Sequence, residues 1–245
     1  MVERRDLDWE GCFNVRDLGG IAVSGGGSVR AGALVRSDNP ERLTAAGWRA
    51  LVEHGVRTVV DLRNDDERRG DSSPRPEEVT TVHVPLDDSA DTVFWNQIWE
   101  NELDGSPLYY RVFIEQKARF CAEALAAVAR ARPGGVLVHC GLGRDRTGLI
   151  VMLALALAGV SPDDIADDYA LSAGRLPPLF QALGVADQTD DIRRILARKG
   201  TTAREALLGA LDGLEVEKQL RAAGLTDVDV AELRARLVQV PTTQD

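Results

Sequence analysis

Short runs of branched apolar residues mark the expected strands of this chain. One run covers residues 56–63 and ends in charged side chains, and a second covers residues 136–139. Residues 79–85 alternate between apolar and polar positions, which is typical of a strand. Nearer the N-terminus, two short apolar segments flank the glycine cluster at 25–27, and this pattern predicts a hairpin.

Segments with a 3.6-residue apolar pattern lie between and after these runs. Thr44 stands at an N-cap position and Gly55 at a stop position, so we expect a helix over residues 45–54. Residues 111–130 predict a longer helix, and the apolar run 149–160 predicts a buried one. Five further segments continue the pattern toward the C-terminus: 161–171, 190–199, 201–214, 216–223 and 228–237.

Strands and helices in this order predict an α/β fold. We expect a central, mostly parallel sheet flanked by helices, followed by a helical C-terminal extension. The length of 245 residues fits one domain over residues 1–245. Within it, residues 9–160 would form the α/β core with its N-terminal hairpin, and residues 161–245 would form a helical subdomain.

Composition narrows the possible partners and the compartment. A formal net charge of −10 argues against nucleic acid and against an anionic membrane as partner. The first residues lack the apolar core of a signal peptide, and three cysteines without a Cys-x-x-Cys pair fit a reducing compartment. We expect a cytoplasmic protein, and secretion without a signal peptide is left open. Neither the cysteines nor the histidines have ligand spacing, so we expect no metal and no other cofactor.

The stretch with the clearest chemistry joins the strand at 136–139 to the apolar run that begins at Leu149. It reads His-Cys-Gly-Leu-Gly-Arg-Asp-Arg-Thr-Gly, with Cys140 near its start and Arg146 near its end. A strand, a glycine-containing loop and a helix form the geometry in which backbone N–H groups surround an anion. Such amides, the Arg146 guanidinium and the Thr147 hydroxyl would stabilise a thiolate, and they also fit a tetrahedral phosphoryl group.

This loop resembles the phosphate-binding loop of the cysteine-dependent tyrosine and dual-specificity phosphatases. The resemblance implies that Cys140 attacks phosphorus and forms a cysteinyl-phosphate, which water then hydrolyses. Arg146 would bind the phosphate oxygens, and Thr147 would assist departure of the thiolate. The residues expected to surround the phosphate are Gly141, Leu142, Gly143, Arg144, Asp145 and Arg146.

Earlier motifs extend the resemblance to about residues 9–240. The segments 14–20, 34–37 and 60–63 read Asn-x-Arg-Asp-Leu-Gly-Gly, Leu-Val-Arg-Ser and Val-Asp-Leu-Arg. Their order is similar to that of the bacterial tyrosine/serine phosphatases related to mycobacterial tyrosine phosphatase B. That branch usually has lysine where this chain has Arg144, and the lysine is associated with tolerance for phosphoinositides. A phosphoinositide phosphatase is therefore kept only as an alternative.

The charged residues of these motifs have two interpretations. Asn14, Arg16 and Asp17 either line the site or, as we favour, hydrogen-bond the hairpin to the body of the domain. Asp61 and Arg63 either brace the phosphate loop or form a structural ion pair, which is the favoured interpretation. The aromatic-rich segment 92–110 is equally a lid over a phenyl phosphate or a helix packed on the core. The charged segment 64–76 is expected to be an exposed loop.

Protonation of the leaving oxygen requires a general acid. Asp145 lies inside the loop, and the bacterial branch is thought to use this position. Asp87, Asp88 or Asp91, which follow the strand at 79–85, could also act as the general acid. Of these, Asp88, with Asp87 beside it, resembles the mobile-loop acid of other branches. We favour Asp145 and keep Asp88 as its competitor.

The predicted partners follow from this chemistry. The substrate would be a phosphorylated protein or a small phosphate monoester, and the product inorganic phosphate. A phosphoprotein-binding module without turnover remains an alternative, although the retention of Cys140, Arg146, Thr147 and an acid argues for catalysis. Sulfur transfer fits less well, because the Arg-Thr pair suits a doubly charged tetrahedral group.

Overall fold

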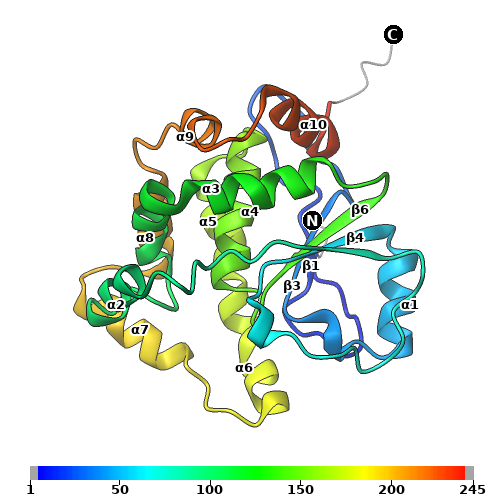
Figure 1. Ribbon diagram of the computed structural model, residues 1–245, viewed down its shortest axis with the longest axis horizontal. Coiled ribbons are helices and arrows are strands. Elements are labelled where there is room, and N and C mark those ends of the chain that lie inside the picture. The colour runs from blue at the N-terminus through cyan, green and yellow to red at the C-terminus, as the bar shows by residue number, and fades with distance from the viewer. Residues whose placement is uncertain (1–4, 241–245) are drawn as a thin grey trace.

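The computed structural model describes residues 5–240, and Figure 1 shows a central sheet with helices on both sides. The sheet has five strands in the order β1-β3-β6-β4-β5. Their bounds are Arg16–Asp17 for β1, Leu34–Ser37 for β3, Val56–Asp61 for β4, Thr80–His83 for β5 and Gly135–His139 for β6. Strands β3, β6, β4 and β5 run parallel and β1 runs antiparallel to β3, which confirms the mostly parallel sheet.

Alternating side chains give the sheet two apolar faces. In β6, Val136 and Val138 pack in one cluster, and Leu137 between them packs in another. Helix α1 (Ala45–Glu53) covers the second cluster with Trp48 and Leu51, and the Thr44 side chain caps its first turn as expected. Because successive strand residues point to opposite faces, the same five-residue strand supports both cores.

The opposite face of the sheet carries two long helices. Helix α3 (Tyr110–Ala129) is interrupted at Lys117, which has non-helical backbone angles, and α4 (Asp145–Leu157) contributes ten buried residues. Both helices were expected from the apolar pattern. No helix within residues 5–240 is long and apolar enough to cross a membrane.

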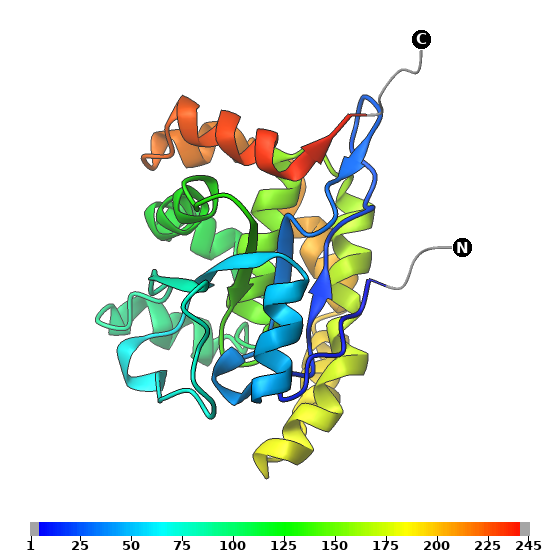
Figure 2. The same cartoon turned by 90° about the vertical axis from the view of Figure 1, so that its right-hand side faces the viewer.

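Helices also make up most of the chain after residue 160. They are α5 (Pro162–Ala170), α6 (Ser172–Leu183), α7 (Thr189–Arg198), α8 (Ala203–Leu211), α9 (Val216–Ala222) and α10 (Asp227–Leu237). The predicted helices are present, and the expected helical C-terminal extension is confirmed. Figure 2 shows β7 (Val238–Gln239) after α10, side by side with β2 (Ser28–Val29), so the expected hairpin region pairs with residues 238–239.

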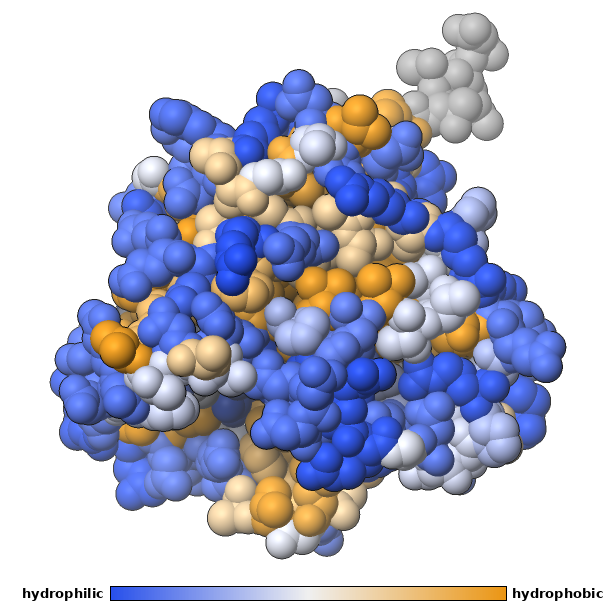
Figure 3. Space-filling view, viewed as in Figure 1, coloured by the Kyte–Doolittle hydropathy of each residue, from blue (hydrophilic) through white to orange (hydrophobic). Residues whose placement is uncertain are grey.

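Helix α6 was not expected, because Pro177 and Pro178 interrupt the pattern by removing two backbone donors. Its apolar side chains nevertheless pack against Leu142 of the loop and against Phe13. In Figure 3 the apolar surface at the lower tip of the molecule lies over α6.

The aromatic-rich segment forms α2 (Thr92–Glu100) and a short turn, η3 (Pro107–Tyr109). Phe94 is buried and stacks edge-to-face on Phe113 of α3, with ring centroids 5.8 Å apart. Trp95 stacks on the same ring at 6.2 Å, whereas Trp99 is exposed. These contacts match the interpretation of a helix packed on the core.

The parallel strands end side by side. Ser37 pairs with His139, and Asp61 pairs with both His139 and His83. The segments that follow these strands therefore meet at one edge of the sheet, where ligands bind in this class of fold. These segments contain Asp38, Glu67, Asp87 and Cys140.

Candidate active site

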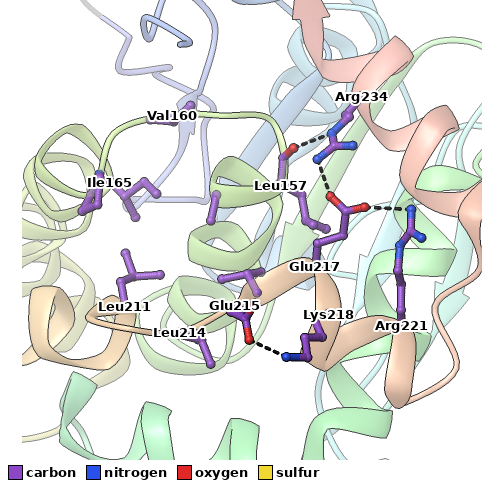
Figure 4. Close-up of a pocket in the computed structure, with 13 residues that line it drawn as sticks. Leu157, Val160, Ile165, Leu211, Leu214, Glu215, Glu217, Lys218, Arg221 and Arg234 are labelled. Carbon is purple, nitrogen blue, oxygen red and sulfur yellow. Dashed lines mark hydrogen bonds and ion pairs between the residues drawn. The ribbon is translucent and has the colours of Figure 1, made fainter.

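Cys140 begins the loop between β6 and α4, at the edge where the strand ends meet. Its exposed fraction is 3%, so the thiol lies below the surface. A different pocket, of about 720 Å³, is drawn in Figure 4; it has an apolar floor and a charged rim with Glu217, Arg221 and Arg234. That pocket includes Leu157 at the end of α4, about 18 Å along the helix from the loop, and has no part in the loop chemistry.

The carbonyl oxygens of the loop are all bound by donors around it. The pairs are His139 Nδ1 with Cys140 O at 3.1 Å, Asn39 N with Gly141 O at 3.2 Å, Asn14 Nδ2 with Leu142 O at 3.0 Å, Arg36 Nη2 with Gly143 O at 2.9 Å, Gly148 N with Arg144 O at 2.9 Å and Tyr110 Oη with Asp145 O at 2.7 Å. Six successive peptide groups are thus fixed through their oxygens.

The backbone N–H groups of residues 141–146 have, by contrast, no acceptor within the described residues 5–240. Buried backbone donors are nearly always paired, so a row of free ones next to a helix start indicates a site for an anion. The loop therefore has the geometry that the sequence predicts for a phosphate cradle.

Gly143 shows why the loop requires glycine. Its φ is +68°, and a Cβ atom built there would lie 2.4 Å from the Ser37 carbonyl oxygen. A side chain would push the loop away from the end of β3, so the close approach depends on this residue.

Arg146 is held by two acidic side chains. Its Nη1 and Nη2 lie 2.5 Å and 2.6 Å from the two carboxylate oxygens of Glu67, and Nη1 lies 3.1 Å from Asp87 Oδ2. Glu67 was not among the predicted site residues, because segment 64–76 was expected to be an exposed loop. The half-buried Glu67 corrects that expectation: it ends the short turn η2 (Asp65–Glu67), which folds back onto the guanidinium.

A capping box was the available signal for Glu67. The Asn64 backbone N–H donates to Glu67 Oε2 at 2.9 Å, and the Asn-x-x-Glu spacing is visible in the sequence. Arg63 supports the turn by donating to the Glu67 carbonyl at 3.4 Å, and it also binds Asp61 and Glu41. The favoured structural ion pair of Asp61 and Arg63 is present, and it is linked to the site through this turn.

Asp87 is a carboxyl group next to Arg146 whose environment favours the protonated form. Burial raises the pKa of Asp87 to about 6, and the negative charges of Glu67 and Asp145 act in the same direction against the opposing effect of Arg146. An acid with a pKa near neutrality is suited to proton transfer.

The other carboxyl groups named as candidate acids have different partners. Asp145 lies at the start of α4, and both its oxygens face Arg144, at 3.0 Å and 3.2 Å from Nε. Asp88 Oδ2 lies 3.2 Å from Lys117 Nζ on α3, and Asp91 binds the same ammonium group. The structure therefore places Asp87, rather than Asp88, against Arg146.

Thr147 is fully buried, and its hydroxyl has no hydrogen-bond partner among the described residues. Among the described residues, this hydroxyl therefore remains free to donate a hydrogen bond. His139 is also buried, and burial lowers its pKa to about 4, so it remains neutral at physiological pH.

Behind the loop lies an ion cluster that we call the rear cluster, made of Arg16, Arg36 and Asp168. Asp168 Oδ1 lies 3.0 Å from Arg16 Nε, and Asp168 Oδ2 lies 2.8 Å from Arg36 Nη1. All three side chains are buried. Arg16 therefore joins the N-terminal segment to the body, as favoured, whereas Asp168 on α5 gave no sequence signal beyond a helical carboxylate.

Comparisons with known proteins identify the family of this chain. A model of the tyrosine phosphatase family matches residues 7–239. A Cupriavidus necator protein with a provisional tyrosine-protein phosphatase name is 32% identical over 245 residues, covering 94% of this chain and 88% of that protein. The triple specificity protein phosphatase PtpB of Mycobacterium tuberculosis is 30% identical over 199 residues, covering 69% of this chain and 70% of PtpB. Among solved structures, P. aeruginosa TpbA in complex with pTyr aligns with 84% of this chain and 98% of its own, with 16% identity and a TM-score of 0.40.

Proposed function

Because this chain belongs to the tyrosine phosphatase family, we propose that it hydrolyses phosphotyrosine in proteins through a cysteinyl-phosphate on Cys140. The observation that supports this most directly is the loop itself. Its carbonyl oxygens are bound from outside, its N–H groups at 141–146 are free among the described residues, and Arg146 stands at its end.

In the first step the Cys140 thiolate attacks phosphorus, so that a P–S bond forms as the bond to the leaving oxygen breaks. The equatorial oxygens carry charge in the transition state. The amides of residues 141–146 and the Arg146 guanidinium bind these oxygens, and this stabilisation is the main contribution of the loop.

Asp87 supplies the proton to the leaving oxygen in this proposal. Its carboxyl is next to Arg146 and its pKa of about 6 leaves part of it protonated at neutral pH. Asp145 is the alternative, and its two oxygens are already paired with Arg144. Asp88 is directed toward Lys117, which makes it the least suited of the three.

The second step releases inorganic phosphate. Asp87, now a carboxylate, accepts a proton from water as the water oxygen attacks phosphorus and the P–S bond breaks. The unpaired hydroxyl of Thr147 donates a hydrogen bond to the departing sulfur, which lowers the free-energy cost of forming the thiolate. The cycle returns Cys140 and Asp87 to their starting protonation states.

We infer that phosphotyrosine is preferred over phosphoserine, because the nucleophile lies below the surface. Cys140 is 3% exposed, whereas the Glu67 side chain at the edge of the site is 33% exposed. A phosphate on the long tyrosine side chain reaches a buried sulfur more readily than one on serine. Phosphoserine, phosphothreonine and phosphoinositides are the competing substrates.

We propose further that the chain acts as one phosphatase domain in the cytoplasm. Apolar side chains from β3 and from α10 belong to the same core cluster, which supports a single unit. Cys12, Cys121 and Cys140 are free thiols, as a reducing compartment permits.

The experiment compares the protein with Cys140→Ser on a small aryl phosphate and on peptides that carry phosphotyrosine or phosphoserine. We expect phosphate release from the aryl phosphate and the phosphotyrosine peptide, and none from either with Cys140→Ser. Equal release by the two proteins would overturn the role of Cys140. Binding of tungstate without any turnover would instead support a phosphoprotein-binding module.

A further inference from the structure

The front of the phosphate loop carries no surplus of positive charge. Arg144 is paired with Asp145, and Arg146 is paired with Glu67 and contacts Asp87. Two guanidinium groups thus face three carboxyl groups. In a chain with a net charge of −10, further positive charge near the loop would add to the affinity that the loop amides provide for a phosphate dianion.

The rear cluster has that surplus. Arg16 and Arg36 are 0% and 1% exposed and share one carboxylate, Asp168. Arg5, whose side chain is 18% exposed, lies 2.7 Å from the same carboxylate but is not counted in the rear cluster. Burial, followed by the charge of Arg36, lowers the pKa of Arg16 to about 10, so Arg16 is still a cation at neutral pH.

The rear cluster contacts the loop at two successive peptide groups. Arg36 Nη2 donates to the Gly143 carbonyl at 2.9 Å. Arg16 Nη1 donates to Asn14 Oδ1 at 2.8 Å, and Asn14 Nδ2 in turn donates to the Leu142 carbonyl at 3.0 Å. The Nε of Arg36 is buried without a hydrogen-bond partner among the described residues, so this guanidinium is not fully compensated.

We propose that Arg36 is a positioning residue that strengthens anion binding from behind the phosphate loop, through its charge and through its hold on the Gly143 carbonyl. The proposal rests on the proposed function, because it assumes that the loop binds the phosphate of the substrate. It assigns no contact between Arg36 and the substrate.

Two physical effects act in the same direction. A cation on a carbonyl oxygen polarises the peptide group, so the N–H of the following residue becomes a stronger donor. For Arg36 that peptide joins Gly143 to Arg144, whose N–H is one of the free donors. A charge buried behind the loop is also poorly screened by salt and attracts an anion in front of it.

The experiment separates the charge of Arg36 from its hydrogen bond. Arg36→Gln keeps a donor for the Gly143 carbonyl and removes the charge, whereas Arg36→Lys keeps the charge and loses the planar fork. Tungstate binding to the full chain is measured by calorimetry at pH 7, beside kcat and KM for a small aryl phosphate. We expect Arg36→Gln to weaken tungstate binding by about tenfold or more and Arg36→Lys by less than about threefold.

Arg5→Met is the matched control, because Arg5 binds Asp168 without a contact to the loop. We expect its tungstate affinity to stay within about twofold of the unchanged protein. A folded Arg36→Gln that binds tungstate normally would overturn the proposal. If Arg36→Gln does not fold, a tenfold or greater loss in Arg36→Lys would overturn it equally, and retained affinity would support it. Failure of the proposed function is distinct, since the unchanged protein would then neither bind tungstate nor release phosphate.

Discussion

Both carboxylate oxygens of Glu67 contact the guanidinium of Arg146, with Oε2 2.5 Å from Nη1 and Oε1 2.6 Å from Nη2. A paired contact of this kind fixes the plane of the guanidinium as well as its position. Burial alone would raise the pKa of Glu67, but its hydrogen bonds from Arg146 lower it, so the carboxylate stays ionised. The two residues are 79 positions apart, so the orientation of Arg146 depends on the folded sheet edge.

We expect Glu67→Ala to lower kcat for an aryl phosphate by about ten- to a hundredfold, because Arg146 loses its fixed orientation. KM should not rise, since removal of a carboxylate leaves more positive charge for the phosphate. Asp66→Ala, on the same turn but with an exposed side chain, is the control and should retain activity. A rise in KM at constant kcat would contradict this explanation.

Gly143→Ala tests the close approach between the loop and β3. The new Cβ would meet the Ser37 carbonyl at 2.4 Å in a backbone with φ of +68°. Gly200→Ala is a matched control, because φ there is +69° and no atom lies within 4 Å. We expect a loss of about 1 kcal/mol in unfolding free energy for Gly200→Ala and about 2–4 kcal/mol for Gly143→Ala, measured in urea. Equal losses would show that the clash is relieved without cost.

Thr147→Val should separate stability from activity. Removal of a buried hydroxyl that has no partner is expected to raise the unfolding free energy by up to about 1 kcal/mol. Because the second step loses its donor to sulfur, kcat should fall by about tenfold while a burst of leaving group persists. Thr58→Val in β4 also removes a buried, unpaired hydroxyl, and it should leave kcat unchanged. Loss of the burst in Thr147→Val would place the defect in the first step.

The pH–rate profile identifies the general acid. With a pKa of about 6, Asp87 is protonated below pH 6, and kcat/KM for a substrate with a poor leaving group should fall about tenfold per unit above it. Asp87→Asn should lack this decline, and Asp88→Asn should retain it. If Asp145→Asn alone removes the decline, the acid is the residue that the sequence analysis favoured.

Asp87 should also make stability depend on pH. Its pKa rises from 3.8 to about 6 on folding, so the folded state holds the proton more tightly. Stability from this group is complete below pH 3.8 and is lost as pH rises through 6. The unfolding free energy of Asp87→Asn should therefore exceed that of the unchanged protein by roughly 1–3 kcal/mol at pH 8 and by a smaller amount at pH 5. Urea unfolding of both proteins at pH 8 and at pH 5 tests this prediction. A difference in unfolding free energy that does not change with pH would contradict it.

Sequence reasoning predicted the part of the candidate site that is contiguous. The strand, the loop of residues 140–146 and α4 follow one another, so local pattern and spacing were sufficient to predict their arrangement. Glu67 and Asp168 were not found, because each reaches the loop through a contact between distant segments. Arg36 and Asp168 are 132 positions apart. From sequence alone, a buried carboxylate on a helix cannot be distinguished from a solvent-exposed one, because its partners come from distant segments.

The candidate acids show the same limit of sequence-based prediction at the level of two adjacent residues. Asp87 and Asp88 are adjacent in the sequence, yet one faces Arg146 and the other faces Lys117. The direction in which the chain leaves β5 decides which carboxyl group reaches the site, and composition does not carry that information. Helix α6 was missed for another reason: tertiary packing on Leu142 compensates for two prolines that disfavour a helix locally.

The binding of the loop carbonyls by Asn14, Arg36 and Asn39 has a consequence for protein engineering. The sequence from His139 to Gly148 does not fix its own shape, since three of the six carbonyl oxygens at positions 140–145 are bound by donors from the first forty residues. Grafting those ten residues onto another strand and helix would transfer the nucleophile without the side chains and backbone groups that bind the loop carbonyls. A working transplant would have to include β3 and the segment before it, so the smallest portable unit of this chemistry is a piece of tertiary structure and not a peptide motif.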